Sequence, residues 1–302
     1  MLTGILAGLG AGALWGVVFV VPRMTLGLSA VDLTAGRFVS FGAVSALAML
    51  LALRTRRLPN LQQAMVAVGM SVLGFTGYYL LLVLAIQDAG TEVPTLIIGT
   101  IPLWMMLLGK PPGLTWKVLA PGIALTATGL ALMMLVNIHG DTLAQGTGAT
   151  DANYWRGIGY ALAAMLSWTV FGLMNSTWLK RHTDVNATDW ANWLGVATGI
   201  GAVLLWFATG SDVKVLIALD HSAYIATICI VTGIGSAWLA TILWNVASQR
   251  LSASLCGQLI VSETVFALVY SYAWDARWPG ALAVTACILF ILGILASIRA
   301  HQ

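Results

Sequence analysis

The chain has 302 residues, of which 59% are hydrophobic and only 8% are charged. Soluble domains carry about one quarter charged residues, so this composition predicts an integral membrane protein. The formal net charge of +3 is small and dispersed along the chain, which excludes the basic surface of a nucleic-acid-binding protein.

The sequence predicts ten transmembrane helices, because it contains ten apolar runs of about 18 to 25 residues bounded by charge, Pro or Gly. The first run lacks a basic segment before it, so we expect a retained span rather than a signal peptide. The fourth run is short and contains Pro94 and Pro102, which predicts a kink where backbone hydrogen bonds are lost. The ten runs cover residues 3–22, 33–53, 64–85, 91–109, 118–136, 157–179, 189–208, 223–247, 252–273 and 280–299.

Glycines recur at four-residue spacing on the first span and again on the seventh. Such small residues let two helix backbones approach closely in a membrane. The sequence leaves open whether they pack within one monomer or between two monomers. The positions are Gly4, Gly8, Gly12, Gly16, Gly195 and Gly199.

Lys and Arg are concentrated on one side of the predicted topology. Cytoplasmic loops are enriched in these residues, so alternate loops give the orientation. We therefore expect both termini to be cytoplasmic, in a bacterial-type inner (plasma) membrane. One side has Arg54, Arg56, Arg57, Lys110, Lys117, Lys180, Arg181, Arg250 and Arg299, and the other has Arg23, Arg156, Lys214 and Arg277.

The chain divides into two halves of five predicted spans each. The connection between them, NIHGDTLAQGTGATDANYW, has the Gly, Thr and Asp content of a flexible linker. We predict a first repeat over residues 1–138, a periplasmic linker over 139–156 and a second repeat over 157–302. Because each half has an odd number of spans, the second half enters from the opposite face. This predicts an inverted repeat with a binding site near the membrane midplane.

Four segments carry a resemblance to a known family. They are Ala13-Leu14-Trp15-Gly16 in the first span, Arg37 in the second, TIPLWMMLLG in the fourth and SETVFALVYSYAW in the ninth. Together with the two five-span halves, they resemble the EamA-type carriers of the drug/metabolite transporter (DMT) superfamily over nearly the whole chain. The resemblance implies a secondary transporter of small organic metabolites, with export as the direction.

Glu263 lies near the middle of the ninth span, within residues 252–272. At about 1.5 Å rise per residue this run just spans a hydrocarbon core of about 30 Å, so Glu263 falls about halfway through the membrane. Ionisable side chains are rare at that depth and face a cavity or a partner. We predict that Glu263 binds a cationic substrate group or a proton in alternation. The alternative is a structural acid hydrogen-bonded to a neighbouring helix.

Other polar and aromatic side chains are predicted to line the same site. Gln258 and Ser262 are four residues apart and share a face of the ninth span. Trp15 and Trp168 occupy equivalent positions in the two halves, mid-span, where their rings suit a cation; packing is the alternative role. The third, sixth and eighth spans add Tyr78, Tyr79, Asn175, Trp244 and Asn245.

Arg37 and Glu92 are predicted to lie at similar depth, a few residues inside their spans. A lone charge there costs about 1 to 3 kcal/mol, so we expect an ion pair or snorkelling to the surface. We assign this pair and Pro102 a structural or gating role. No metal or cofactor is expected, because Cys229, Cys256 and Cys287 lie in apolar runs. The histidines lack ligand spacing: His139, His182, His221 and His301.

These features predict an alternating-access carrier of a small amine-bearing metabolite, such as an amino acid or an organic cation. Its expected partners are substrate, membrane lipid and protons, and it is a monomer or a homodimer. The alternative within transport is a neutral or anionic metabolite anchored by Arg37. An intramembrane enzyme is not favoured, because the sequence has no HExxH or GxSxG motif. A non-transporting receptor is not favoured either, because the chain has no sizeable soluble domain.

Overall fold

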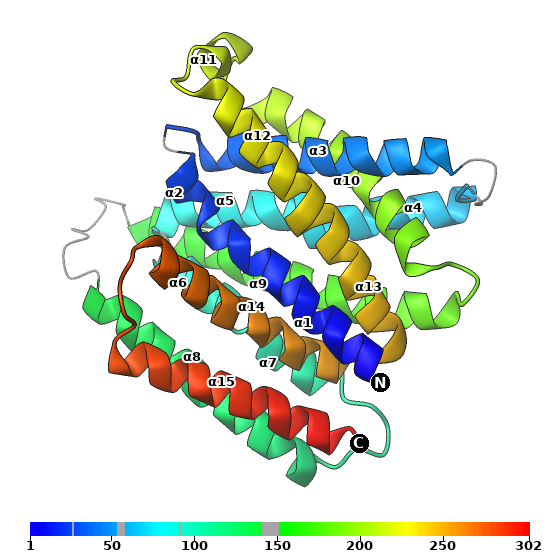
Figure 1. The fold of residues 1–302 in the computed structure, drawn as a ribbon, viewed down its shortest axis with the longest axis vertical. Helices are drawn as coiled ribbons and strands as arrows, with labels where there is room; N and C mark the ends of the chain where they lie inside the picture. Colours follow the sequence, from blue (N-terminus) through cyan, green and yellow to red (C-terminus); the bar gives the residue numbers. More distant parts are fainter. Residues whose placement is uncertain (26, 53–57, 91, 141–150) are drawn as a thin grey trace.

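The computed structural model is an all-helical bundle throughout the part of the chain that it describes. That part comprises residues 1–25, 27–52, 58–90, 92–140 and 151–302, without the side chains of Glu92, 134–140 and Asp151. Figure 1 shows the N- and C-termini at the same edge of the molecule. We call the end of the bundle that carries both termini the terminus end, and the opposite end the far end.

The first half of the chain forms a set of helices that are interrupted at three places. The first predicted span is continued by a short 3-10 segment and a last helical turn. The third contains a π-helical segment, and the fourth is divided in two. The elements are α1 Leu2–Gly16, η1 Val17–Phe19, α2 Val21–Met24, α3 Ala30–Leu51, α4 Leu61–Ser71, η2 Val72–Thr76, α5 Gly77–Ala89, α6 Glu92–Gly99, α7 Ile101–Leu108 and α8 Trp116–Gly140.

The second half has longer uninterrupted helices and one π-helical segment. A short helix, α11, lies in the connection between the seventh and eighth predicted spans. Helices α8 and α9 extend into both ends of the predicted linker 139–156, of which 141–150 lie outside the described residues. The elements are α9 Asp151–Arg181, α10 Ala187–Thr209, α11 Val213–Ile217, α12 Ser222–Thr232, η3 Gly233–Leu239, α13 Ala240–Arg250, α14 Ala253–Trp274 and α15 Ala281–Ala300.

Nine helices within the described residues are long and apolar enough to cross a membrane. The fourth predicted span instead falls on a shorter apolar helix, Val93–Leu108. It is interrupted at Thr100, and Pro102 occupies the first turn of α7. The interruption lies in the run where the prolines predict a kink. Pro102 is tolerated in the first turn of α7 because a backbone N–H at that position has no partner within the helix.

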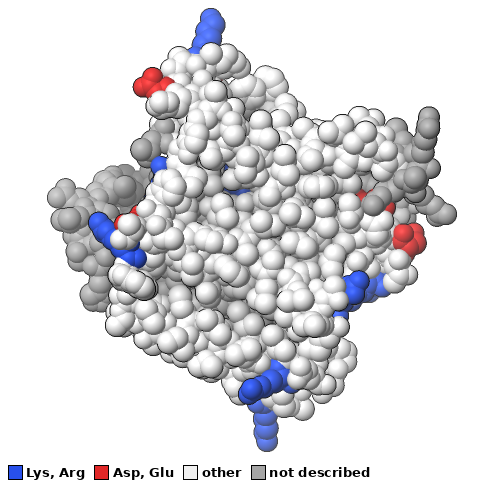
Figure 2. Space-filling model, viewed as in Figure 1, with Lys and Arg blue, Asp and Glu red and all other residues white. Residues whose placement is uncertain are grey.

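The charged side chains lie at the margins of the face drawn in Figure 2, and the broad surface between them is almost free of charge. Many large hydrophobic side chains of the described residues are exposed, including Leu204 at 65% and Phe207 at 77%. In a soluble protein such an apolar surface would drive aggregation, whereas in a membrane it contacts acyl chains. The fold therefore agrees with the membrane protein that the composition predicts.

The glycine stripe of α1 packs against α14 and the residues that precede it. A Cβ added to Gly4 would lie 2.9 Å from Leu251 Cγ, and one added to Gly8 would lie 2.6 Å from Leu259 Cδ1. The seventh-span glycines serve a second close contact, in which a Cβ on Gly199 would lie 2.7 Å from the Cα of Gly42. Close packing by small residues is thus confirmed, and both contacts are within one monomer.

Helices of the two halves pack against one another in a regular pattern. Helix α3 packs along α10, and α8 packs along α15. Helix α1 lies against α13 and α14 of the second half, while α9 lies against α5, α6 and α7 of the first. The core between the halves therefore includes the middle of α1, α9, α13 and α14, which carry most of the residues predicted to bind substrate.

Candidate functional site

Packing around α14 changes abruptly at its midpoint. Every residue from Ser254 to Ser262 is buried, whereas from Glu263 to Trp274 only Ala267 is buried. The terminus-end half is held by backbone contact with the end of α7, since Ser254 N donates to Gly109 O at 3.1 Å. Ser254 Oγ also donates to Met106 O at 3.1 Å. Helix α14 is therefore buried along its terminus-end half and partly exposed along its far-end half.

Glu263 is the first residue beyond the buried half of α14, and it is partly exposed. Its carboxylate has no hydrogen-bond or ion-pair partner in the described part of the chain. The Tyr78 hydroxyl, on α5, lies close enough to interact electrostatically with it. Glu263 is therefore an ionisable group at mid-helix whose carboxyl is not used in a hydrogen bond or ion pair with another described side chain.

Helix α1 crosses α14 at Glu263. A Cβ on Gly12 would lie 3.1 Å from the backbone N of Glu263, and one on Gly16 would lie 3.1 Å from its backbone O. A larger residue at either position would push the two backbones apart. The glycines thus fix the level at which Trp15, between them on α1, faces the centre of the protein.

Three tryptophans from both halves of the chain form a cluster, which we call the Trp triad: Trp15 of α1, Trp168 of α9 and Trp244 of α13. The ring centroids are 6.4 Å apart for Trp15 and Trp168, 5.5 Å for Trp15 and Trp244, and 6.0 Å for Trp168 and Trp244. Trp15 and Trp168 remain partly exposed, whereas Trp244 is only 1% exposed. The first two rings therefore offer π faces, and Trp244 is core in this conformation.

The two asparagines predicted for the site contact each other. Asn175 Nδ2 donates to Asn245 Oδ1 at 3.1 Å, and Trp190 Nε1 donates to Asn175 Oδ1 at 2.7 Å. All three side chains are fully buried. The network joins α9, α10 and α13, so the amides hold helices together in this conformation. Trp190 is a partner that sequence reasoning missed, because nothing in its spacing distinguishes it from the other tryptophans of the seventh span.

Gln258 bridges α14 to the outer helix pair formed by α8 and α15. Its Nε2 donates to Thr126 Oγ1 at 2.8 Å, and its Oε1 accepts from Ser297 Oγ at 3.0 Å. Ser262 Oγ donates to Leu259 O at 2.7 Å within α14, and the side chain packs against Gly12. Both predicted polar residues are thus buried with their hydrogen bonds formed inside the protein.

Tyr79 and Arg37 lie nearer the far end, between α3 and α5. Tyr79 Oη donates to Ala30 O at 2.6 Å. Arg37 is 8% exposed, and its Nε is buried without a hydrogen-bond partner among the described residues. The side chain of Glu92 lies outside the described part, so the Arg37–Glu92 pair stays a prediction. Pro102 is buried in the first turn of α7, next to the break in the fourth span.

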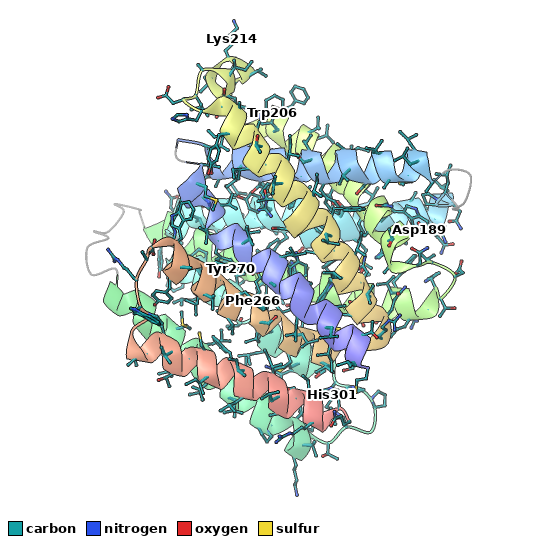
Figure 3. The ribbon with its side chains drawn as sticks, viewed as in Figure 1. Asp189, Trp206, Lys214, Phe266, Tyr270 and His301 are labelled. Atoms are coloured by element: carbon teal, nitrogen blue, oxygen red, sulfur yellow. The ribbon has the colours of Figure 1, made fainter. Side chains whose placement is uncertain are left out.

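The far-end half of α14 carries aromatic side chains that the sequence analysis did not assign to the site. Phe266 and Tyr270, both labelled on α14 in Figure 3, are stacked with ring centroids 6.1 Å apart. Phe266 and Tyr270 are four residues apart and follow Glu263 closely, so their spacing already indicated in the sequence that they share a face of this helix. Glu263 is thus a partly exposed acid near Tyr78, on a helix that also carries aromatic side chains. This arrangement suits a small organic cation.

Comparison with known proteins identifies the class. Residues 2–135, which comprise most of the first half, match the EamA-like transporter family. The match agrees, over most of the first half of the chain, with the resemblance seen in the sequence, and the long apolar helices agree with a multi-pass membrane protein.

Two relatives cover almost the whole chain. The inner membrane protein YtfF of Escherichia coli (strain K12) is 28% identical in an alignment of 321 residues including gaps, which covers 99% of this chain and 96% of that protein. A solved crystal structure superposes with a TM-score of 0.76 at 21% identity, covering 98% of each chain. At that identity the second likeness concerns the fold alone.

Proposed function

We propose that this protein is a secondary-active carrier of small amine-bearing metabolites, such as amino acids or organic cations, and that it works by alternating access. The observation that carries the proposal is Glu263, an acid at mid-helix without a described partner, at the point where buried packing gives way to partial exposure. An unpaired carboxylate at that depth is costly unless it serves a ligand or an ion.

The helix contacts support an inverted repeat built from residues 1–138 and 157–302. The second predicted span packs against the seventh (α3 against α10), and the fifth packs against the tenth (α8 against α15). The first span packs on the eighth and ninth, just as the sixth packs on the third and fourth. The π-helical segments η2 and η3 also interrupt the third and eighth spans, which are equivalent in the two halves. Such reciprocal packing is what a pseudo-two-fold axis in the membrane plane would produce.

Alternating access is supported by buried polar groups on α13. Thr241 Oγ1 and Trp244 Nε1 are buried without hydrogen-bond partners among the described residues. Each buried polar group without a partner lowers the free energy of unfolding by about 1 to 3 kcal/mol. A second conformation, opened at the terminus end, would give these groups water or substrate as a partner. In that conformation Thr241 and Trp244 would line the part of the substrate pathway that opens at the terminus end.

The distribution of basic residues supports cytoplasmic termini, and the relative YtfF supports an inner-membrane location. In this orientation the conformation described here is closed to the cytoplasm and loosened towards the periplasm. Export is the proposed direction. Coupling to protons would follow from competition at Glu263, because a protonated carboxyl no longer attracts an ammonium group.

Purified protein in proteoliposomes tests the proposal. Counterflow is measured with panels of labelled amino acids and organic cations, for the wild type, Glu263→Gln and Asp184→Asn, in which an exposed carboxylate is removed. Wild type and Asp184→Asn should transport an amine, more slowly as the pH on the binding side is lowered from 8 to 5. Glu263→Gln should fold normally and lose both transport and its pH dependence. Unchanged, pH-dependent transport by Glu263→Gln would contradict the proposal.

Arg37 favours a second candidate, a carrier of neutral or anionic metabolites in which Glu263 is structural. Its guanidinium is buried, and Nε lacks a described partner. Guanidinium groups bind carboxylates well in two-point contacts. Competition separates the candidates: amines should inhibit transport in the first, whereas carboxylic acids should inhibit it in the second and lose their effect in Arg37→Gln.

A further inference from the structure

A groove opens between the far ends of α14 and α15, away from the Trp triad. Its volume is about 510 Å³, which lies in the range of small-molecule sites. Its walls are almost entirely apolar and include Val269, Ile288 and Ile291, which are 54%, 51% and 47% exposed. Both helices are candidate membrane spans, so these side chains face the acyl chains of the bilayer.

The rim of the groove is polar and carries a positive charge. Arg277 and Trp278 line it in the connection from α14 to α15, where the chain leaves the membrane. Trp278 is 95% exposed, as expected for an indole at headgroup level. The acid nearest in sequence, Asp275, is already paired with Arg23 at 2.8 Å. Asp275 therefore does not neutralise Arg277, and the guanidinium of Arg277 has no ion-pair partner within the described part of the chain.

An apolar trough that ends in an unpaired cation at the membrane surface matches one kind of molecule. We propose that the groove binds an anionic phospholipid of the far leaflet, with an acyl chain along Val269 and Ile288 and the phosphate at Arg277. A zwitterionic lipid fills the trough equally well but brings its own cation to the rim. This binding does not depend on the transported substrate.

Cys287 lines the groove and reports on its occupancy. The other two cysteines are buried, with Cys229 7% and Cys256 0% exposed, so Cys287 should react first with N-ethylmaleimide. The protein is placed in nanodiscs of phosphatidylcholine, alone or mixed with phosphatidylglycerol, and the reaction rate is followed by mass spectrometry. The variants are Arg277→Gln and the control Lys214→Gln, which removes a cation on α11 far from the groove (Figure 3).

Phosphatidylglycerol should slow the labelling of Cys287 in the wild type and in Lys214→Gln. In Arg277→Gln, the preference of the groove for phosphatidylglycerol over phosphatidylcholine, measured by the protection of Cys287, should fall about fivefold. This is the effect of one surface cation on the binding of an anionic lipid. Ala273→Phe narrows the trough while Arg277 remains, and it should weaken protection by both lipids. Equal protection by the two lipids in the wild type would overturn the proposal. So would an unchanged preference in Arg277→Gln, or protection that depends on protein density, which would indicate a second copy in the groove.

Discussion

At the scale of single residues, burial separates the predicted site residues into two groups. Glu263, Trp15, Trp168 and Tyr78 keep exposed surface, whereas Gln258 is fully buried between two hydrogen-bond partners. A side chain whose donors and acceptors are already used cannot bind a ligand without breaking those bonds. In this conformation Gln258 therefore joins helices rather than contacting substrate.

Replacing Gln258 by Leu should destabilise the protein by about 1 to 3 kcal/mol, because the hydroxyls of Thr126 and Ser297 would be left buried without a partner. Thermal unfolding in detergent measures the effect, with the exposed Gln62→Leu as the matched control. Transport per folded molecule should be retained. A variant as stable as the wild type but unable to transport would instead place Gln258 in the binding site.

At the scale of helices, the position of Glu263 depends on how closely α1 approaches α14. The glycines of α1 allow backbone contact on both sides of Glu263, at Gly12 and Gly16. Four-residue glycine spacing creates a groove into which the facing helix fits, so a single added methyl group acts on the whole interface. The depth of the acid is thus set by backbone contact rather than by its own side chain.

Gly12→Ala should therefore destabilise the protein by about 1 to 3 kcal/mol through overpacking against Ser262 and the backbone of Glu263. Gly159→Ala is the matched control, because a Cβ there meets no atom within 4 Å. That variant should be neutral, or stabilised by up to about 1 kcal/mol through lower chain entropy. Equal melting temperatures for the two variants would show that α1 and α14 have room to separate.

At the scale of the whole molecule, the two ends of the bundle differ in packing. The terminus end is closed by α7 and α1 against α14, and the far end is partly exposed along Phe266 and Tyr270. The alternating access proposed above requires a second conformation, in which the terminus end opens and the far end closes.

Thiol labelling in cells tests this difference. Single cysteines replace Tyr270 or Leu259 in a chain whose three native cysteines are changed to Ala, and a membrane-impermeant maleimide is added from outside. Tyr270→Cys should react, because it lies in the loosely packed half of α14, whereas Leu259→Cys is fully buried and should be protected. Equal reactivity at both positions would contradict a structure closed at the terminus end.

Much of the fold follows from local sequence. Apolar run length predicts the spans because a helix must cross a hydrocarbon layer of fixed thickness, and glycine spacing predicts the smooth face of α1. The π-helical segments and the exact position of the break at Thr100 were harder to predict from the sequence, since they depend on how neighbouring helices satisfy the hydrogen bonds of the backbone.

The candidate site divides in the same way. By itself the sequence determined that an acid stands midway along an apolar run, and it predicted that polar side chains of the spans turn to the protein interior, because charged and amide groups avoid lipid. Only the tertiary structure decided that Gln258 and the two asparagines are used in bonds between helices, and that Glu263 keeps partial exposure where α1 crosses α14. Such pairings join residues far apart in the chain, so helix packing decides which polar groups stay available for a ligand.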